Sequence, residues 1–115
     1  METWTAAELT RVADRLLAGC FENREAPRVK DLARTLRMST ANFSDYFLRV
    51  VGIRPLEYLR RRRIERGKHL LRTTNLSIEE IAVLCCFGNT VTFFRAFKRI
   101  ARTTPAQFRK ETEKM

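Results

Sequence analysis

The feature that most constrains the fold of this chain is an internal repeat. Leu32-Ala33 recurs as Ile81-Ala82 at an offset of 49 residues. Four more positions recur at an offset of 50: Phe43, Phe47, Pro55 and Tyr58 correspond to Phe93, Phe97, Pro105 and Phe108. The one-residue difference falls between the two helices of each unit, where a turn absorbs it. A chain of 115 residues has room for two such units and a connecting segment, but not for a large enzyme.

Apolar residues recur at helical spacing, and the residues between them are those that begin and end helices. Thr5 and Glu8 predict a capping box that opens a first helix running to about Gly19. Pro55 opens a long helix through about Arg72, roughly 25 Å in length, with Leu56 among its inward residues. The other predicted helix starts are Pro27, Ser39, Ser77 with Glu80, Asn89 or Thr90, and Thr104-Pro105.

These signals predict an all-α fold of seven helices, in which two helix-turn-helix subdomains are joined by a long central helix. The predicted divisions are an N-terminal subdomain over 1–54, a linker helix over 55–73 and a C-terminal subdomain over 74–115.

The positive charge is concentrated in the middle of the chain. Of the formal net charge of +10, residues 1–53 carry +1, residues 54–72 carry +6 and residues 73–115 carry +3. The central share surrounds the run Arg60-Arg61-Arg62-Arg63. A concentrated basic stripe on a folded domain is typical of a protein that binds a polyanion. Charge alone does not separate DNA from RNA or from an anionic membrane surface.

Several function classes find no support in the residues. No apolar run approaches the ~20 residues of a membrane span, and no signal segment opens the chain, so we expect a cytoplasmic protein with no membrane partner. The three cysteines include the adjacent pair Cys85-Cys86, and the single His69 has no partner at ligand spacing. We therefore expect no metal, no cofactor and no catalytic residues.

The repeated unit has the spacing of a helix-turn-helix. A short helix, a tight turn and a second helix capped by Ser or Asn place the N-terminal outer residues of the second helix toward the major groove of DNA. In such a unit Ala33 and Ala82 are small because the second helix crosses close over them.

The stretch from Leu32 to Arg109 resembles the DNA-binding domain of AraC/XylS-type transcription regulators. The resemblance rests on Arg63-Ile64, Gly67 and Leu70-Leu71 of the long helix, Ile-x-x-Ile-Ala at 78–82, Phe87, Phe-x-Arg-x-Phe-Lys at 93–98 and Thr-Pro-x-x-Phe-Arg at 104–109. It implies a bilobal, homeodomain-like domain whose two recognition helices enter successive major grooves of double-stranded DNA, ~34 Å apart. It also implies contact with RNA polymerase, and binding as a monomer, either by a stand-alone regulator of the MarA/SoxS type or by part of a longer one.

The resemblance also places the base-facing residues. They are Thr40, Ala41, Ser44 and Asp45 in the first recognition helix, and Thr90, Val91, Phe94 and Arg95 in the second. Arg95 suits guanine because a guanidinium bonds O6 and N7 together, with a phosphate contact or a salt bridge as the alternative. Asp45 either accepts from a cytosine amino group or is solvated. Phe94 either touches thymine methyl groups or belongs to the core.

Other residues are predicted to contact DNA phosphates. They are Ser39, Arg60, Arg61, Arg62, Asn89, Lys98, Arg99 and Arg109. Arg63 lies on the inward stripe of the long helix, and we expect it to be a structural residue with a carboxylate partner.

A second function class stays open at this point. Arg37, Cys86 and Arg102 stand where the family usually has glycine, and Ala41 and Asp45 are small or acidic. These departures suit an interaction module or anti-activator of the same fold that binds DNA weakly or without specificity. RNA binding is less favoured because the chain lacks stacking aromatics on a sheet or groove.

Overall fold

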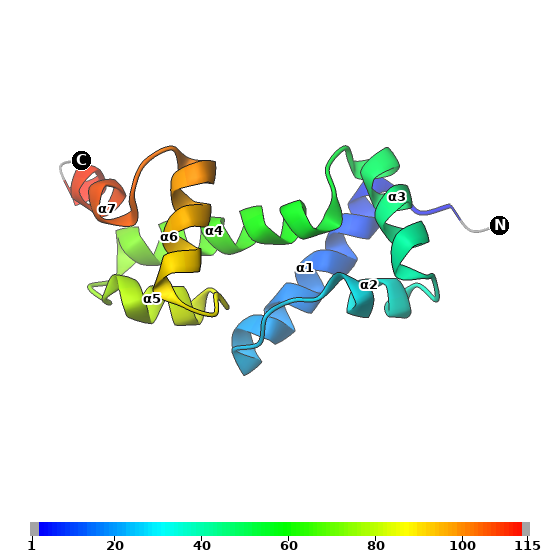
Figure 1. Cartoon of the computed structure of the whole chain (residues 1–115), viewed down its shortest axis with the longest axis horizontal. Coiled ribbons are helices and arrows are strands. Elements are labelled where there is room, and N and C mark those ends of the chain that lie inside the picture. Colours follow the sequence, from blue (N-terminus) through cyan, green and yellow to red (C-terminus); the bar gives the residue numbers. More distant parts are fainter. Residues whose placement is uncertain (1–2, 114–115) are drawn as a thin grey trace. The chain divides into compact units, whose positions relative to one another are not determined.

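The computed structural model describes residues 3–113, which form seven α-helices and no strand, as the sequence predicts (Figure 1). The helices are α1 (Ala6–Asn23), α2 (Val29–Thr35), α3 (Thr40–Val51), α4 (Pro55–Thr73), α5 (Ile78–Leu84), α6 (Thr90–Ala101) and α7 (Pro105–Glu113). They divide into two compact units. Unit 1 comprises residues 3–23 and 27–59, and unit 2 comprises residues 24–26 and 60–113. Within the described residues no helix is both long and apolar enough to span a membrane.

The core of unit 1 is built around two phenylalanines of α3. Phe43 and Phe47 are buried, and their ring centroids lie 5.7 Å apart. Tyr58 at the start of α4 packs edge-on against Phe47, also at 5.7 Å. Its hydroxyl donates to Asp14 Oδ1 of α1 at 2.8 Å. Other buried apolar residues complete this core, namely Leu9, Ala13, Leu17, Leu32, Ala33 and Leu59.

The core of unit 2 repeats this arrangement. Phe93 and Phe97 of α6 pack with ring centroids 5.7 Å apart, and Phe108 of α7 packs edge-on against Phe97 at 5.5 Å. The remaining buried members are Ile64, Leu71, Ile81, Ala82, Cys85, Phe87 and Ala96. The same aromatic triad at the same spacing shows that the repeat in the sequence is a repeat in the packing.

Gly67 of α4 lies at the closest approach within unit 2. A Cβ atom added there would meet Phe93 Cε1 at 3.1 Å and Cys85 Sγ at 3.6 Å. A glycine inside a helix costs about 1 kcal/mol relative to alanine. The space that it leaves beside α4 is occupied by the Phe93 ring.

The turns between the paired helices have the same backbone hydrogen bonds. The carbonyl oxygen of Ala33 accepts from the Met38 N–H at 2.9 Å, and that of Ala82 accepts from the Phe87 N–H at 3.0 Å. The residue before each donor is left-handed, with φ of 56° at Arg37 and 65° at Cys86. The two turns are therefore the same structure built from different residues.

Most predicted helix ends are confirmed, because their caps are local hydrogen bonds. Glu8 N–H donates to Thr5 Oγ1, and Glu8 Oε1 accepts from both the N–H and the hydroxyl of Thr5. Ser77 caps α5 by accepting from the Glu80 N–H at 3.1 Å. Gly52 ends α3 with φ of 97°.

Three predictions about helices are wrong. The second helix begins at Val29 and not at Pro27, because the backbone of its N-cap, Arg28, is still extended. The first helix does not stop near Gly19 but continues to Asn23, because Cys20 is buried and Phe21 packs against the core of unit 1. Leu56 is not inward but 46% exposed. In the first turn of α4 the buried residue is Pro55, and successive helix residues point about 100° apart.

Candidate nucleic-acid interface

The recognition helix of unit 1, α3, begins at a serine cap and exposes a small, weakly charged face. Ser39 Oγ accepts from the Asn42 N–H at 3.2 Å. The predicted base-facing residues Thr40, Ala41 and Asp45 are exposed, and Ser44 is half-buried beside the core. The back of the helix is anchored by Tyr46, whose hydroxyl accepts from the Trp4 N–H at 2.6 Å and donates to the Trp4 carbonyl at 3.1 Å.

The recognition helix of unit 2, α6, has the same design with a different exposed face. Its cap is Asn89, whose Oδ1 accepts from the Thr92 N–H at 2.8 Å, so the cap is Asn89 rather than Thr90. Val91 and Phe94 are 57% and 40% exposed, and Arg95, the residue after Phe94, is also exposed. Phe94 therefore lies outside the core.

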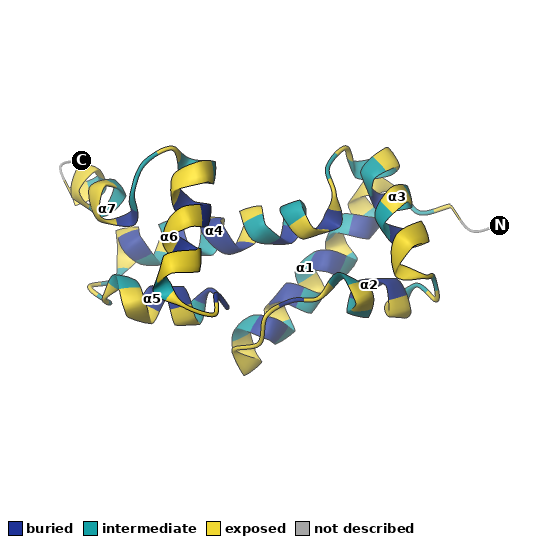
Figure 2. Cartoon of the chain, viewed as in Figure 1, coloured by how far each residue is buried: buried dark blue, intermediate teal, exposed yellow. Residues whose placement is uncertain are grey.

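On both helices the exposed residues run along the side away from the unit's core (Figure 2). Each unit thus presents a capped helix whose outer face is accessible. The α3 face carries hydroxyls, a methyl group and a carboxylate, whereas the α6 face carries apolar side chains and a guanidinium.

The four consecutive arginines of α4, Arg60 to Arg63, differ in burial. Arg61 and Arg62 are exposed and Arg60 is half-buried, whereas Arg63 is only 7% exposed. Arg63 Nη1 donates to the Cys86 carbonyl at 3.0 Å, and its Cζ lies 4.4 Å from the centroid of the Phe87 ring. Arg63 therefore ties α4 to the turn between α5 and α6. This is a structural role, as predicted, but these two contacts are with a backbone carbonyl and an aromatic ring and not with the predicted carboxylate.

Arg109 is also held within the protein. Its Nε donates to the Leu71 carbonyl at 3.3 Å and its Nη2 to the Thr74 carbonyl at 3.2 Å. The last carbonyl groups of a helix have no hydrogen-bond donor within the helix. At the end of α4 the half-buried side chain of Arg109 provides such donors. We therefore leave Arg109 out of the phosphate-binding set that we propose below.

A hollow of about 260 Å³ lies beside α6 in unit 2. Its lining residues are Arg60, Thr92, Arg95, Ala96 and Arg99. Lys98 is exposed on the same helix but does not line the hollow. Three arginines from two helices therefore line one concave surface.

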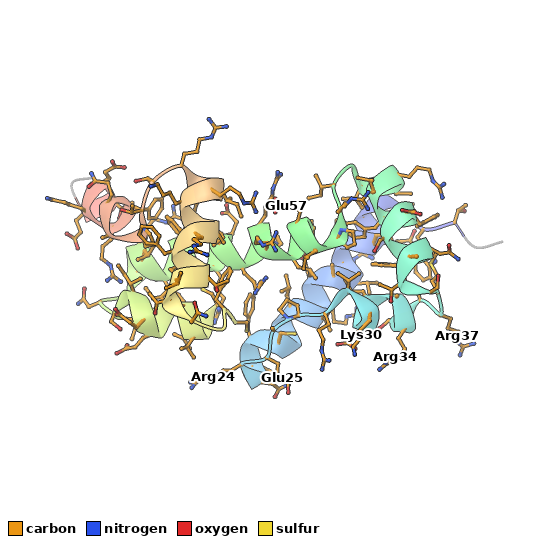
Figure 3. All side chains as sticks on the ribbon, viewed as in Figure 1. Arg24, Glu25, Lys30, Arg34, Arg37 and Glu57 are labelled. Atoms are coloured by element: carbon orange, nitrogen blue, oxygen red, sulfur yellow. The ribbon has the colours of Figure 1, made fainter. Side chains whose placement is uncertain are left out.

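Unit 1 has exposed basic residues that the sequence reasoning missed. Lys30 and Arg34 of α2, and Arg37 of the turn, are exposed, and Figure 3 shows Arg34 and Arg37 extending outward. Arg34 Nη1 lies 3.8 Å from Asp31 Oδ1. Ion pairs at exposed positions such as this one contribute little to stability. The first helix of a helix-turn-helix crosses the DNA backbone. Applied to the first unit, that geometry would have identified these residues from the sequence.

The cysteines are free and buried. Burial raises the pKa of the Cys85 thiol to about 12, so that thiol stays protonated at neutral pH. Among residues 3–113 no group of three or more His, Cys, Asp or Glu side chains is arranged to hold a metal ion.

Known proteins share this architecture. A protein-family model described as a helix-turn-helix domain matches residues 32–111. The transcriptional regulator AlkR of Acinetobacter baylyi is 30% identical over 112 residues, which cover 96% of this chain and 37% of AlkR. PqrA of Proteus vulgaris, described as a probable transcription factor, is 30% identical over 89 residues, covering 77% of this chain and 73% of PqrA.

A solved structure provides the link to nucleic acid. The DNA-binding domain of AdpA, a global transcriptional factor crystallised in complex with a target DNA, superposes with a TM-score of 0.75 at 29% identity. The match covers 86% of this chain and 90% of that one.

Two capped helix-turn-helix units in one chain define the DNA-binding domain of a transcription regulator. This chain belongs to the AraC-type family of helix-turn-helix regulators, which confirms the resemblance seen in the sequence. It spans about a third of the length of the first curated relatives that it matches, with shares of 31%, 37% and 33%. AlkR is described as a transcriptional regulator, and PqrA and AdpA as transcription factors.

Proposed function

We propose that this domain reads a specific sequence of double-stranded DNA by placing α3 and α6 in adjacent major grooves. The observation that supports the proposal most strongly is the repeated geometry. Each unit has the same turn, the same aromatic triad and a capped second helix with an exposed outer face.

In unit 2 the base contacts come from Val91, Phe94 and Arg95, with Thr90 at the start of the helix. Arg95 bonds O6 and N7 of a guanine, because a guanidinium matches that pair of acceptors in the major groove. Val91 and Phe94 are three residues apart, which places them on one face of the helix. Exposed apolar side chains in that position touch thymine methyl groups.

In unit 1 the base contacts come from Thr40, Ala41, Ser44 and Asp45. Ala41 touches a thymine methyl and Asp45 accepts from a cytosine amino group. This unit offers fewer strong hydrogen-bond donors to bases than unit 2, so it contributes less sequence discrimination.

Phosphate contacts position both helices on the duplex. In this proposal they come from Ser39, Arg60, Arg61, Arg62, Asn89, Lys98 and Arg99. We add Lys30, Arg34 and Arg37, because these basic residues of unit 1 are exposed. Ser39 and Asn89 cap the N-termini of α3 and α6, where backbone N–H groups favour an anion.

The domain acts in the cytoplasm on a bacterial promoter, as a monomer that needs no cofactor and catalyses no reaction. RNA polymerase is its protein partner there, contacted through surfaces that do not face DNA. Two forms of the whole regulator fit this proposal: a stand-alone domain, or the DNA-binding part of a longer regulator.

Selection of bound duplexes from a random pool tests the proposal. We expect a bipartite site whose two halves lie about one helical turn apart, ~34 Å. The Arg95→Ala variant should lose preference at one base position, with about 1–3 kcal/mol less discrimination there. Equal enrichment of every sequence at moderate salt would instead identify an interaction module or anti-activator of this fold.

The thymine contacts have a test of their own. Replacing thymine by deoxyuridine removes the 5-methyl group and keeps the pairing. In the half-site read by α6, this replacement should weaken binding of the native protein by roughly threefold to tenfold, because apolar contact is lost. A Val91→Ser/Phe94→Ser double variant should be insensitive to it. If native protein binds both duplexes equally, the two side chains do not read methyl groups.

A further inference from the structure

The hollow beside α6 is lined by residues of two helices. Of its five lining residues, Thr92, Arg95, Ala96 and Arg99 come from α6 and Arg60 comes from α4. Residues four and three positions apart lie along one side of a helix. Thr92, Ala96 and Arg99 therefore define one flank of α6, and Arg95 lies between this flank and the outer face.

The position of this flank decides what it can meet in a complex with DNA. A helix with its side chains is about 10–12 Å across, and the major groove is about 12 Å wide. When the outer face of α6 meets base edges, its flanks meet the sugar-phosphate backbones that border the groove. The hollow therefore faces backbone, and not bases, in the complex that we propose.

The chemistry of the lining suits one anion. A guanidinium presents its N–H donors in a planar fork that matches two oxygens of a phosphate. Thr92 adds a hydroxyl that can donate, and Ala96 has no side chain beyond Cβ to fill the space. A phosphate placed in this hollow would lie beside three positively charged side chains, and each of them attracts it.

We infer that this hollow holds a single DNA backbone phosphate, bound jointly by Arg60 of α4 and Arg99 of α6. Arg95 borders the same phosphate while its guanidinium reaches the guanine. One phosphate thus links the long helix to the recognition helix and fixes the register of Arg95 on the bases. This inference rests on the proposed function, because it requires α6 in a major groove.

Neutral methylphosphonate linkages test the inference directly. Each linkage of the α6 half-site is replaced in turn, and binding is measured for native protein and for the Arg60→Gln and Arg99→Gln variants. Each variant should bind the unmodified duplex about tenfold more weakly, as expected for loss of a hydrogen bond to a charged group. At one linkage, the same for both variants, this penalty should fall below about twofold, because the shared phosphate charge is already absent.

Lys98→Gln is the matched control. Lys98 is exposed on α6 but does not line the hollow. The Lys98→Gln substitution should therefore weaken binding equally on the unmodified duplex and on the duplex in which the two arginine substitutions lose their effect. Thermal unfolding followed by circular dichroism should show that all three variants remain folded.

The salt dependence of binding gives a second readout. The slope of log affinity against log salt changes by about 0.9 for each phosphate neutralised on B-DNA. The Arg60→Gln/Arg99→Gln double variant should therefore lower the slope by about one if both arginines share a phosphate, and by about two if they bind separate ones.

Three results would overturn the inference. The first is that the affinity losses of Arg60→Gln and Arg99→Gln disappear at different methylphosphonate linkages. The second is a slope loss of about two in the double variant. The third is that no methylphosphonate linkage removes the affinity loss of either variant, while inorganic phosphate shifts the Arg60 and Arg99 signals in nuclear magnetic resonance spectra. That result would assign the hollow to a free anion. Failure of native protein to prefer any duplex would count against the proposed function itself.

Discussion

At the scale of single residues, the two turns show what a side chain costs in a left-handed backbone. Arg37 and Cys86 have φ of 56° and 65°, and Arg102 at the end of α6 has φ of 62°. A residue with a Cβ atom pays about 1–2 kcal/mol for this conformation. Cys86 is buried and packs in the core of unit 2, but Arg37 and Arg102 are exposed, so nothing in their burial offsets the cost.

Replacement of Arg37 by glycine should therefore stabilise unit 1. We expect Arg37→Gly to raise the free energy of unfolding by about 1 kcal/mol, measured by urea denaturation. Arg37→Ala removes the same charge but keeps the Cβ atom, and it should give no gain. Arg34→Gly, inside α2, should lose about 1 kcal/mol. A gain for Arg37→Ala equal to that for glycine would show that charge, and not backbone strain, is the cause.

The run of four arginines separates binding from folding within one turn of helix. Arg63→Ala removes the hydrogen bond to Cys86 and the contact with Phe87, and should cost about 2–4 kcal/mol of stability. Arg61→Ala, at an exposed position, should change stability by less than about 0.5 kcal/mol. It should instead weaken binding to all DNA sequences alike. Chemical denaturation and a salt-dependent binding series measure the two effects, and equal destabilisation by both variants would contradict this division.

At the scale of elements, α1 depends on a cap that titrates. The backbone hydrogen bond from the Thr5 N–H lowers the pKa of Glu8 below its ordinary value of 4.5, and the hydrogen bond from the Thr5 hydroxyl adds to this. A carboxylate with a lowered folded-state pKa stabilises the fold above its unfolded-state pKa. That contribution disappears as pH falls through the lower, folded-state value.

The Glu8→Ala variant tests the sign of this effect. Above about pH 5 the native protein should be the more stable of the two, and the difference should shrink steadily as pH falls below 4.5. Unfolding curves between pH 3 and 7 measure it. Glu8→Gln, which keeps a side-chain oxygen for the cap, should show less pH dependence than native protein. A difference between native and Glu8→Ala that grows toward acid would contradict the assignment.

The same elements show which predictions the sequence supports. Caps such as Thr5, Ser39 and Ser77 are predictable because donor and acceptor lie within three residues of each other. The continuation of α1 past Gly19 depends on whether Cys20 and Phe21 find a core, which is a tertiary contact. The hydrogen bonds of Arg109 are tertiary contacts too, because its carbonyl partners lie 35 and 38 residues away. The sequence therefore predicted a phosphate contact for Arg109 and did not reveal these bonds.

The candidate site divides in the same way. The repeat predicts which sides of α3 and α6 face outward because residues 50 apart pack alike. Most of the predicted base-facing residues are exposed, whereas Ser44 and Thr90 are half-buried. Phe94 is exposed, which excludes the alternative that it belongs to the core. The hollow was not predictable. Arg60 and Arg99 are separated by 39 positions, and only the packing of α6 in unit 2 brings them to one surface.

At the scale of the whole molecule, net charge by segment gives an incomplete picture of the basic surface. Residues 1–53 sum to only +1, which predicts a weaker electrostatic grip by the first unit. Yet this stretch exposes Lys30, Arg34 and Arg37 on α2 and its turn, where Asp31 is the one acidic residue, while Glu8 and Asp45 lie on other helices. Affinity depends on where the charge is presented and not only on its sum over a segment.

The central claim is that both recognition helices read one duplex, and binding to a selected bipartite site tests it most directly. Affinity is compared for the site itself, for a copy with five base pairs inserted between its halves, and for a scrambled duplex, all at one salt concentration. The account predicts that the site is preferred over scrambled DNA by at least about a thousandfold. It also predicts that the insertion, which turns one half-site to the opposite side of the duplex, removes most of that preference. Equal affinity for all three duplexes would contradict it.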